Sequence, residues 1–210
     1  MKILGIIPAR GGSKRLPRKN LADLGGKPLI QWSIDVAVKS KVFDEIFVST
    51  EDEEIGKIAG EFWWKRDPSF AKDDTPSIKV IEEILDKVDC TISVLLQPTS
   101  PFRIVEDIQK SLELIQTTNA DSVFSTKEGP KDLAYQVGWA NRLRTIPNIV
   151  VPNGSLFLLT TDAFNRGEDW FTGNTYGYLM PKERSIDIDN EQDLAIARHL
   201  VDNGLYKKSA

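Results

Sequence analysis

The chain has 210 residues, of which 40% are hydrophobic, so it has the size of one globular domain and enough apolar side chains for a full core. Its 27 basic and 31 acidic residues give a net charge of -4, which argues against a protein that wraps a polyanion such as DNA. No apolar run approaches the ~18 residues that cross a bilayer, which excludes a transmembrane role. The single cysteine, Cys90, and an N-terminus without a signal peptide's apolar stretch lead us to expect a cytoplasmic protein.

Strands and helices alternate in the predicted secondary structure of the first 126 residues. The first segment, Ile3-Leu4-Gly5-Ile6-Ile7, is a short apolar run that ends at Pro8, as expected for a strand buried on both faces. Apolar residues then recur at helical spacing, and Pro28 suits a first helical turn. We predict strands over 2–8, 45–49, 91–96 and 121–126, and helices over 28–39, 52–62, 77–88 and 105–117.

This alternation predicts a three-layer α/β/α fold, with a mostly parallel, doubly wound sheet covered by helices on both faces. Such sheets bind ligands beyond the carboxyl ends of their strands, so we expect function in the strand-to-helix loops. Residues 127–152 lack clear periodicity and predict a short excursion or arm. Strands over 155–160 and 176–180 and a helix over 190–202 then complete a single domain that covers 1–210.

The loop after the first strand, residues 9–21, reads ARGGSKRLPRKNL and holds five basic residues and two adjacent glycines. A glycine such as Gly11 lets backbone N–H groups approach an anion closely. Arg10 supplies a planar fork for phosphate oxygens, and Lys14 and Lys19 supply compact charges. So much positive charge at the ligand edge of an acidic protein predicts a phosphate site rather than a solvated loop. The spacing fits neither GxxxxGK[ST] nor GxGxxG, which disfavours a P-loop kinase and a Rossmann dehydrogenase.

Two aspartates lie in the segment SIDIDN, residues 185–190. Asp187 and Asp189 are two residues apart in an extended segment, so both side chains point to the same side. Such a pair can hold Mg2+, which favours oxygen ligands and bridges substrate phosphates. The simpler interpretation is that Asp189 or Asn190 caps the last helix, with Asp193 in its first turn. The two interpretations are compatible, because a cap uses only one acid.

Other polar and aromatic residues predict little on their own. The loop QPTSPFR, residues 97–103, is equally a proline-stiffened turn, and residues 66–75 are a polar loop. We expect His199 to be an ordinary surface residue of the last helix. Trp63 and Trp64 are expected in the core or in an interface.

The segments IPARGGSKRLPRKNL, LLQPTSPFR and SIDIDNEQDL, with NGSLF between the last two, closely resemble the CMP-sialic acid synthetase (acylneuraminate cytidylyltransferase) family in order and spacing. The resemblance covers residues 1 to about 126 and returns from Asn153 to the C-terminus. It implies a fold like that of nucleotide-diphospho-sugar transferases. It also implies an Mg2+-dependent transfer of CMP from CTP to the anomeric hydroxyl of a nonulosonic acid of the sialic, legionaminic or pseudaminic type, with release of pyrophosphate.

The resemblance also implies roles for individual residues. The nucleotide would contact Arg10, Lys14, Lys19, Asn20, Arg66, Thr75 and Gln97. Asp187 and Asp189 would bind Mg2+, and catalysis would depend on Arg10, Lys19 and Asp189. The base would be one of the two carboxylates, with Asp189 preferred, or a metal-bound hydroxide. The sugar would contact Gln97, Arg142 and Asn153. Residues 127–152 would be a shortened form of the arm through which family members usually form homodimers and complete a neighbouring sugar pocket.

Three alternatives stay open. The same phosphate site and acid pair would serve 3-deoxy-manno-octulosonate as the sugar, or GTP in place of CTP. A non-catalytic nucleotide-binding module would bind the nucleotide without releasing pyrophosphate. A basic-loop protein that binds nucleic acid is disfavoured by the acidic balance, and it would show a steep salt dependence of binding.

Overall fold

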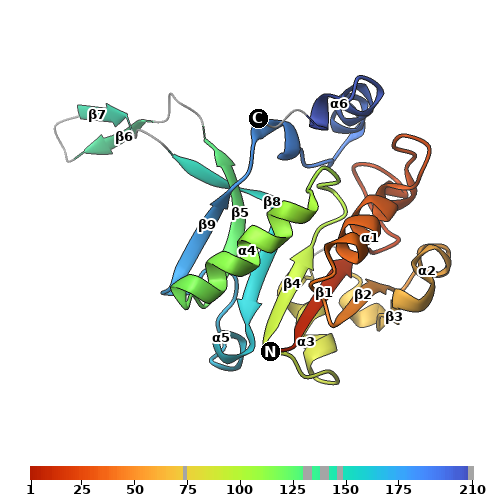
Figure 1. Ribbon diagram of the computed structural model, residues 1–210. Helices are drawn as coiled ribbons and strands as arrows, with labels where there is room; N and C mark the ends of the chain where they lie inside the picture. Colours follow the sequence, from red (N-terminus) through yellow and green to blue (C-terminus); the bar gives the residue numbers. More distant parts are fainter. Residues whose placement is uncertain (73–74, 130–133, 138–141, 146–148, 208–210) are drawn as a thin grey trace.

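The computed structural model describes residues 1–72, 75–129, 134–137, 142–145 and 149–207. Its centre is a seven-stranded sheet in the order β3-β2-β1-β4-β8-β5-β9, with helices on both faces (Figure 1). The strands are β1 Ile3–Pro8, β2 Glu45–Thr50, β3 Trp63–Lys65, β4 Ile92–Leu96, β5 Ser122–Glu128, β8 Val150–Thr160 and β9 Thr175–Leu179. The predicted three-layer architecture is confirmed.

The direction of the strands is mostly parallel, with one reversal. β1 pairs in parallel with β2 and β4, β2 with β3, and β5 with β9. β8 runs antiparallel between β4 and β5. Hydrophobic periodicity did not predict this reversal. A periodic pattern identifies a buried strand, but it does not show whether that strand runs parallel or antiparallel to its neighbours. The edge strand β3 was not predicted either, since three residues are too few to show a pattern.

The helices begin and end close to the predicted positions. They are α1 Leu29–Ser40, α2 Glu53–Ala59, α3 Ser77–Leu85, α4 Val105–Thr118, α5 Thr161–Asn165 and α6 Glu191–Asp202. The helix predicted over 52–62 ends earlier, at Gly60, whose φ of 58° does not continue an α-helix. α5 was missed because five residues show no helical period. None of the helices in the described ranges has the length and apolar character to span a membrane.

The core lies on both sides of β1, as its continuous apolar run predicts. Ile7 packs on one face with side chains of α1, α2 and α4, whereas Leu4 and Ile6 pack on the other with α3 and α5. Trp63 and Trp64 are partly buried against these two clusters, which confirms their expected place in the core.

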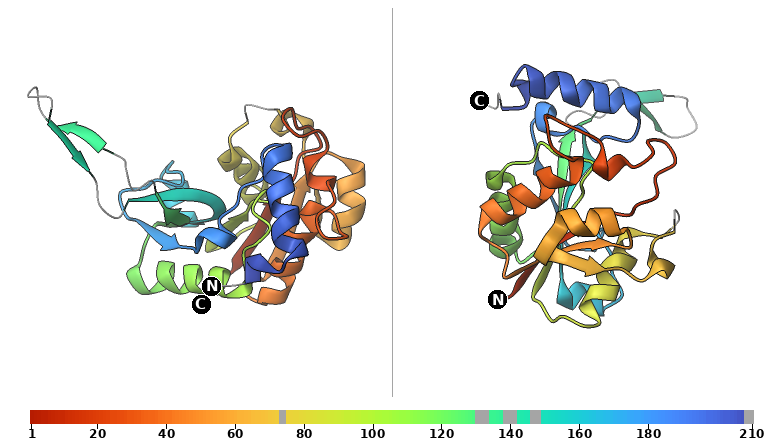
Figure 2. Two further views of the ribbon diagram at one scale, coloured as in Figure 1. Left: turned by 90° about the horizontal axis from the view of Figure 1, so that it is seen from above. Right: turned by 90° about the vertical axis from the view of Figure 1, so that its right-hand side faces the viewer.

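α6 packs over the first loop instead of against the sheet. Leu194 and Ala197 of α6 form a third apolar cluster with Leu16 of the first loop, with Leu24 just after that loop and with Ile188 of the acid segment. We define the acid segment as residues 184–190. Figure 2 shows α6 beside the N-terminal loop, although the two are far apart in the sequence. This packing brings the acid segment to the carboxyl edge of β1.

The predicted excursion contains a β-hairpin. β6 (Ala134–Val137) and β7 (Arg142–Thr145) pair antiparallel as a separate two-stranded sheet. β5 continues to Glu128 and β8 begins at Val150, so the excursion is shorter than the predicted 127–152. The hairpin stands away from the main sheet in Figure 1. Its role as an arm in dimerisation stays a prediction.

Candidate active site

The first loop is held at the carboxyl end of β1 by side-chain contacts. Asn20 is 8% exposed, and its Nδ2 donates to the carbonyl oxygen of Arg10 at 2.9 Å. The N–H of Gly11 donates to Glu51 Oε1 at 2.7 Å. Arg18 donates to Asp52 Oδ2 at 2.5 Å. The described contacts therefore give Asn20 a role in shaping the loop, while its predicted contact with a nucleotide stays a prediction.

The structure leaves no space for a side chain at Gly11, whereas it does leave space at the neighbouring Gly12. A Cβ added to Gly11 would lie 2.4 Å from Asp52 Oδ2 and 2.8 Å from Asp52 Cβ, but nothing lies within 4 Å of one added to Gly12. Asp52 also caps α2, because its carboxylate accepts from the N–H groups of Glu54 and Ile55. The first glycine of the pair is therefore fixed by packing at the site.

We expect Gly11→Ala to displace Asp52 and to lower the free energy of unfolding by about 1–3 kcal/mol. Binding of CTP, the nucleotide that the resemblance implies, should weaken at least about tenfold, because the loop shifts where phosphates would bind. Gly12→Ala is the matched control and should change neither quantity. Urea denaturation and calorimetric titration measure the two effects. Equal CTP affinity in both variants would place the nucleotide elsewhere.

The acid segment meets the first loop through Asp189. Lys19 Nζ lies 3.0 Å from Asp189 Oδ1, and Arg15 Nη2 lies 2.8 Å from Asp189 Oδ2. Ile188 between the two acids is fully buried, and its N–H donates to the carbonyl of Thr99 at 2.8 Å. Since neighbouring side chains alternate in an extended segment, we expect both acids on the side opposite to the buried Ile188.

The helix cap is a separate feature from the acid pair. Asn190 Oδ1 accepts from the N–H groups of Gln192 and Asp193, and the Asp193 carboxylate accepts from the N–H of Asn190. This reciprocal arrangement is a capping box. Of the two residues expected as the cap, Asn190 is confirmed, with Asp193 in the first turn, whereas the Asp189 carboxylate pairs with Lys19 and Arg15.

The two carboxylates have different electrostatic surroundings. Desolvation of the Asp187 carboxyl raises its pKa, and the charge of Asp189 raises it further, against the effects of Thr99 and Lys19. Desolvation also acts to raise the pKa of Asp189, but Lys19 and Arg15 outweigh it and hold this pKa below its usual value. Without a bound cation, the Asp187 carboxyl therefore holds a proton more readily than the Asp189 carboxyl does.

The two acids fit a divalent cation. Among the described residues, no three His, Cys, Asp or Glu side chains gather as a complete metal site, so a cation here would draw its other ligands from substrate and water. The donors are carboxylate oxygens, which suit Mg2+. A cation between them would also offset the repulsion that raises the pKa of Asp187. Arg15, with a side chain 71% exposed, is the partner of Asp189 that has room to move.

Arg66 lies at the end of β3 and is 4% exposed. Its Nε donates to Ser49 Oγ at 2.9 Å and its Nη2 donates to the carbonyl of Ser49 at 2.6 Å. Burial lowers the pKa of Arg66, and the charge of Arg10 lowers it further. Two of the predicted nucleotide ligands, Arg10 and Arg66, therefore lie near each other at the carboxyl edge. Thr75 is partly exposed, and its N–H donates to the carbonyl of Lys72 at 3.2 Å.

A buried arginine holds the end of β4. Gln97, the predicted ligand of nucleotide and sugar, is partly buried there, and its carbonyl accepts from Arg103 Nη2. Arg103 also donates to Ser33 Oγ at 2.7 Å and to the carbonyl of Ser155. Burial lowers the pKa of Arg103 to about 9, so it stays a cation at neutral pH. The sequence did not predict that Arg103 holds the end of β4, because in the sequence Arg103 is only one polar residue of a proline-containing turn.

Asn153 is also buried, at 3% exposure, and its amide contacts the protein interior. Its Oδ1 accepts from Ser125 Oγ at 2.6 Å and from the N–H of Ser155 at 3.1 Å, and its Nδ2 donates to Ser185 Oγ at 2.9 Å. The amide thus joins β5 and β8 to the acid segment. A direct contact with sugar stays a prediction. Arg142 lies on β7, and its side chain is outside the described part of the chain.

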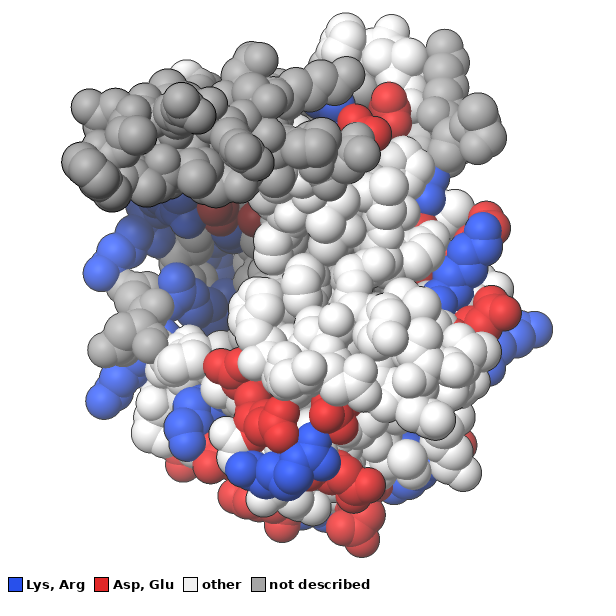
Figure 3. All heavy atoms as spheres, turned by 90° about the vertical axis from the view of Figure 1, so that its left-hand side faces the viewer, with Lys and Arg blue, Asp and Glu red and all other residues white. Residues whose placement is uncertain are grey.

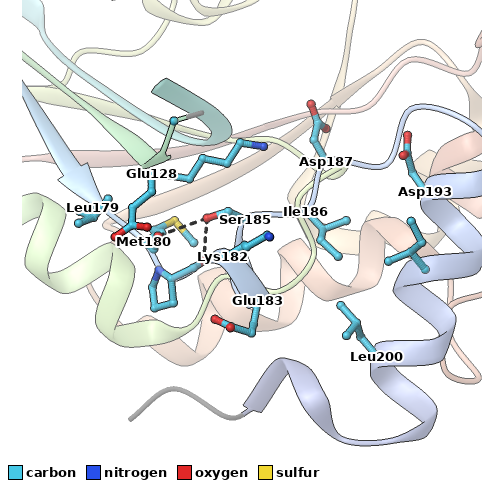
Figure 4. Close-up of a pocket in the computed structure, with 14 residues that line it drawn as sticks. Glu128, Leu179, Met180, Lys182, Glu183, Ser185, Ile186, Asp187, Asp193 and Leu200 are labelled. Carbon is cyan, nitrogen blue, oxygen red and sulfur yellow. Dashed lines mark hydrogen bonds between the residues drawn. The ribbon is translucent and has the colours of Figure 1, made fainter. Parts of the chain in front are cut away.

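A cavity of about 1110 Å³ lies beside Asp187, between the end of β5, the segment after β9 and α6. Lys127 and Asp187 give it polar walls, and Ile186, Ile196 and Leu200 give it apolar ones. In Figure 4, Asp187 and Asp193 lie on one side of the cavity, and Met180 lies on the other. Its volume is ample for a sugar-sized ligand next to the acid pair.

The sequence is similar to those of known proteins. The family model described as "Cytidylyltransferase" matches residues 4–147. The N-acylneuraminate cytidylyltransferase of Streptococcus agalactiae serotype III is 36% identical over 213 residues, which cover 92% of this chain and 52% of that protein. The CMP-N,N'-diacetyllegionaminic acid synthase of Legionella pneumophila is 32% identical over 230 residues, which cover 96% of this chain and 97% of that protein. The chain thus spans about half the length of the streptococcal relative.

A solved structure shares the fold. A CMP:2-keto-3-deoxy-manno-octonic acid synthetase complexed with CTP superposes with a TM-score of 0.75, covering 97% of this chain and 100% of that one, at 18% identity. The matching family model, the similar relatives and the shared fold all indicate the same family. The chain belongs to the cytidylyltransferase family, in its CMP-sialic acid synthetase branch.

Proposed function

We propose that this protein transfers CMP from CTP to the anomeric hydroxyl of a nonulosonic acid of the sialic, legionaminic or pseudaminic type and releases pyrophosphate. The observation that carries the proposal is the contact of 3.0 Å between Lys19 of the basic loop and Asp189 of the acid segment. It puts cations suited to phosphates beside carboxylates suited to Mg2+. The names of the streptococcal and Legionella relatives support CTP and an acidic sugar as the substrates.

The chemistry of this transfer assigns a task to each group. The sugar oxygen attacks the α-phosphorus of CTP, the bond to pyrophosphate breaks, and the hydroxyl proton passes to a base, for which we propose one of the two carboxylates, Asp189 or Asp187. Negative charge grows on the α-phosphate and the leaving pyrophosphate, where Arg10, Lys14 and Lys19 would stabilise it. Mg2+ held by Asp187 and Asp189 would supply further positive charge at the phosphates.

We also propose that the protein is a cytoplasmic homodimer. Two large apolar side chains are exposed on β9 and just before it: Phe171 is 62% exposed and Leu179 is 52% exposed. The middle of the face at this edge of the sheet is largely uncharged (Figure 3). Exposed apolar patches of this kind mark interaction surfaces. Light scattering on the purified protein measures the mass, and a monomer at micromolar concentration would contradict the dimer.

One array of assays tests the proposed activity. Pyrophosphate release is measured with Mg2+ for CTP, GTP, ATP and UTP, each with sialic, legionaminic, pseudaminic and 3-deoxy-manno-octulosonic acids. We expect release with CTP and at least one of the first three sugars. Release only with 3-deoxy-manno-octulosonate, or only with GTP, would change the substrate. Silence throughout, with tight CTP binding, would favour a non-catalytic module.

A further inference from the structure

A buried ion pair lies behind the acid segment. Asp107 has no exposed surface and Arg184 is 5% exposed. Arg184 donates from Nε to Asp107 Oδ2 at 3.1 Å and from Nη2 to Asp107 Oδ1 at 2.7 Å. The hydroxyl of Tyr178 also donates to Asp107 Oδ1, at 3.1 Å, and the N–H of Ile104 donates to Oδ2 at 2.9 Å. One carboxylate thus joins the first turn of α4, the strand β9 and the turn before the acid pair.

Stability alone does not explain such a pair. Desolvating two charges costs about as much as their attraction returns, and apolar side chains of similar volume often stabilise a fold equally well. A bidentate pair adds a fixed geometry, because the planar guanidinium group donates two parallel hydrogen bonds that hold the carboxylate in one orientation. The position of Arg184 in the chain decides what this geometry fixes.

Arg184 is the first of three tethers along the acid segment. Ser185 follows it, and its hydroxyl accepts from Asn153 and donates to the carbonyl of Pro181 at 2.8 Å. The third tether is the bond from the N–H of Ile188 to Thr99, in the loop after β4. Asp187 lies between the second and third tethers, and Asp189 follows the third. The backbone that carries both acids is thus anchored to α4, to β8 and to the loop after β4.

We infer that Asp107 and Tyr178 are positioning residues for the acid pair, which act through Arg184 to fix the backbone from which Asp187 and Asp189 bind a divalent cation. The inference rests on the proposed function for its cation. It assigns a task in cation binding to two residues that lie outside the acid segment and are not expected to touch substrate. Asp107 is joined to the segment only by folding, since Asp107 and Arg184 are 77 positions apart.

Tyr178→Phe tests the inference with the smallest change, since the ring stays and one hydrogen bond to Asp107 is lost. Tyr176→Phe is the matched control, because Tyr176 lies on the same strand and the same face, with 43% exposure. Two measurements need no turnover. One is amide hydrogen exchange of residues 185–190 without metal or substrate, and the other is Mn2+ binding followed by electron paramagnetic resonance, with and without CTP.

For Tyr178→Phe we expect exchange of 185–190 to rise and Mn2+ affinity to fall, each at least about threefold, as for the loss of one bond to a charged group. Metal-free CTP affinity should stay within about twofold, because the first loop is unchanged. Tyr176→Phe should match the wild type. Asp107→Asn should show larger changes of the same kind, and if it does not fold, Tyr178→Phe decides alone.

Two results would overturn the inference. One is a Tyr178→Phe variant with a lower melting temperature but wild-type exchange and Mn2+ affinity, which would leave the pair a purely structural role. The other is a wild-type protein that binds no Mn2+, which would remove the cation site as well. Intact Mn2+ binding without pyrophosphate release from any sugar would count against the proposed activity, and the exchange and Mn2+ results would still decide the positioning role.

Discussion

Asp189→Asn is expected to lower the rate of pyrophosphate release by at least about two to three orders of magnitude, the size of effect seen when one electrostatic group at a reacting centre is lost. The variant loses the charge that pairs with Lys19 and Arg15, and it leaves a single carboxylate for a divalent cation. Its fold should be unchanged, because the Asp189 side chain is 33% exposed and α6 is capped by Asn190.

Asp187→Asn should show a loss of similar size, for the same reason. Glu191→Gln is the matched control, since Glu191 is an exposed acid in the first turn of α6 and should keep wild-type turnover. A coupled pyrophosphate assay over a range of Mg2+ concentrations measures the effect, and circular dichroism checks the fold. Full activity in either aspartate variant would remove the metal assignment.

Arg10→Ala is expected to weaken transition-state stabilisation by about 2–4 kcal/mol, which is a fall in kcat/KM of roughly 30-fold to 1000-fold. Arg10 lies two residues after the carboxyl end of β1, and its charge contributes to the lowered pKa of Arg66. A developing charge on the α-phosphate should gain more from Arg10 than bound CTP does, so kcat should fall more than CTP affinity.

Lys110→Ala serves as the control for Arg10→Ala, because Lys110 is an exposed cation on α4 whose described ion pair is with Glu106. Steady-state kinetics with saturating sugar and varied CTP separate kcat from KM. A loss below about threefold would move Arg10 to the periphery of the site. A rise in KM with unchanged kcat would mean that Arg10 binds the ground state and the transition state equally.

Much of the fold could be predicted from periodicity. The apolar run from Ile3 to Ile7 predicted a central strand, and helical spacing found α1, α3, α4 and α6 to within a few residues at each end. The reversal of β8 could not be predicted in this way, because a strand with two buried faces has the same apolar pattern in either direction.

Part of the candidate site could also be predicted from the sequence, and part could not. The spacing of Asp187 and Asp189 predicted that they share a side, and the rule for parallel sheets placed the basic loop at the ligand edge. The basic loop contacts the acid segment directly, through Lys19 and Asp189. This contact depends on how α6 packs over the first loop, which no local sequence pattern predicts. The buried partners Asp107 and Arg184 were missed because each is one polar residue in an otherwise ordinary segment, and only the folded chain brings them together.

The reversed strand β8 also sets the order in which the sheet can close during synthesis. β4 and β5 are its neighbours in the sheet, yet both are synthesised before Val150–Thr160. Until then each of them presents an unpaired edge, which is a template for pairing with other chains. Nascent chains that stop before residue 150 are therefore expected to aggregate, and chaperone dependence should fall sharply once β8 has inserted.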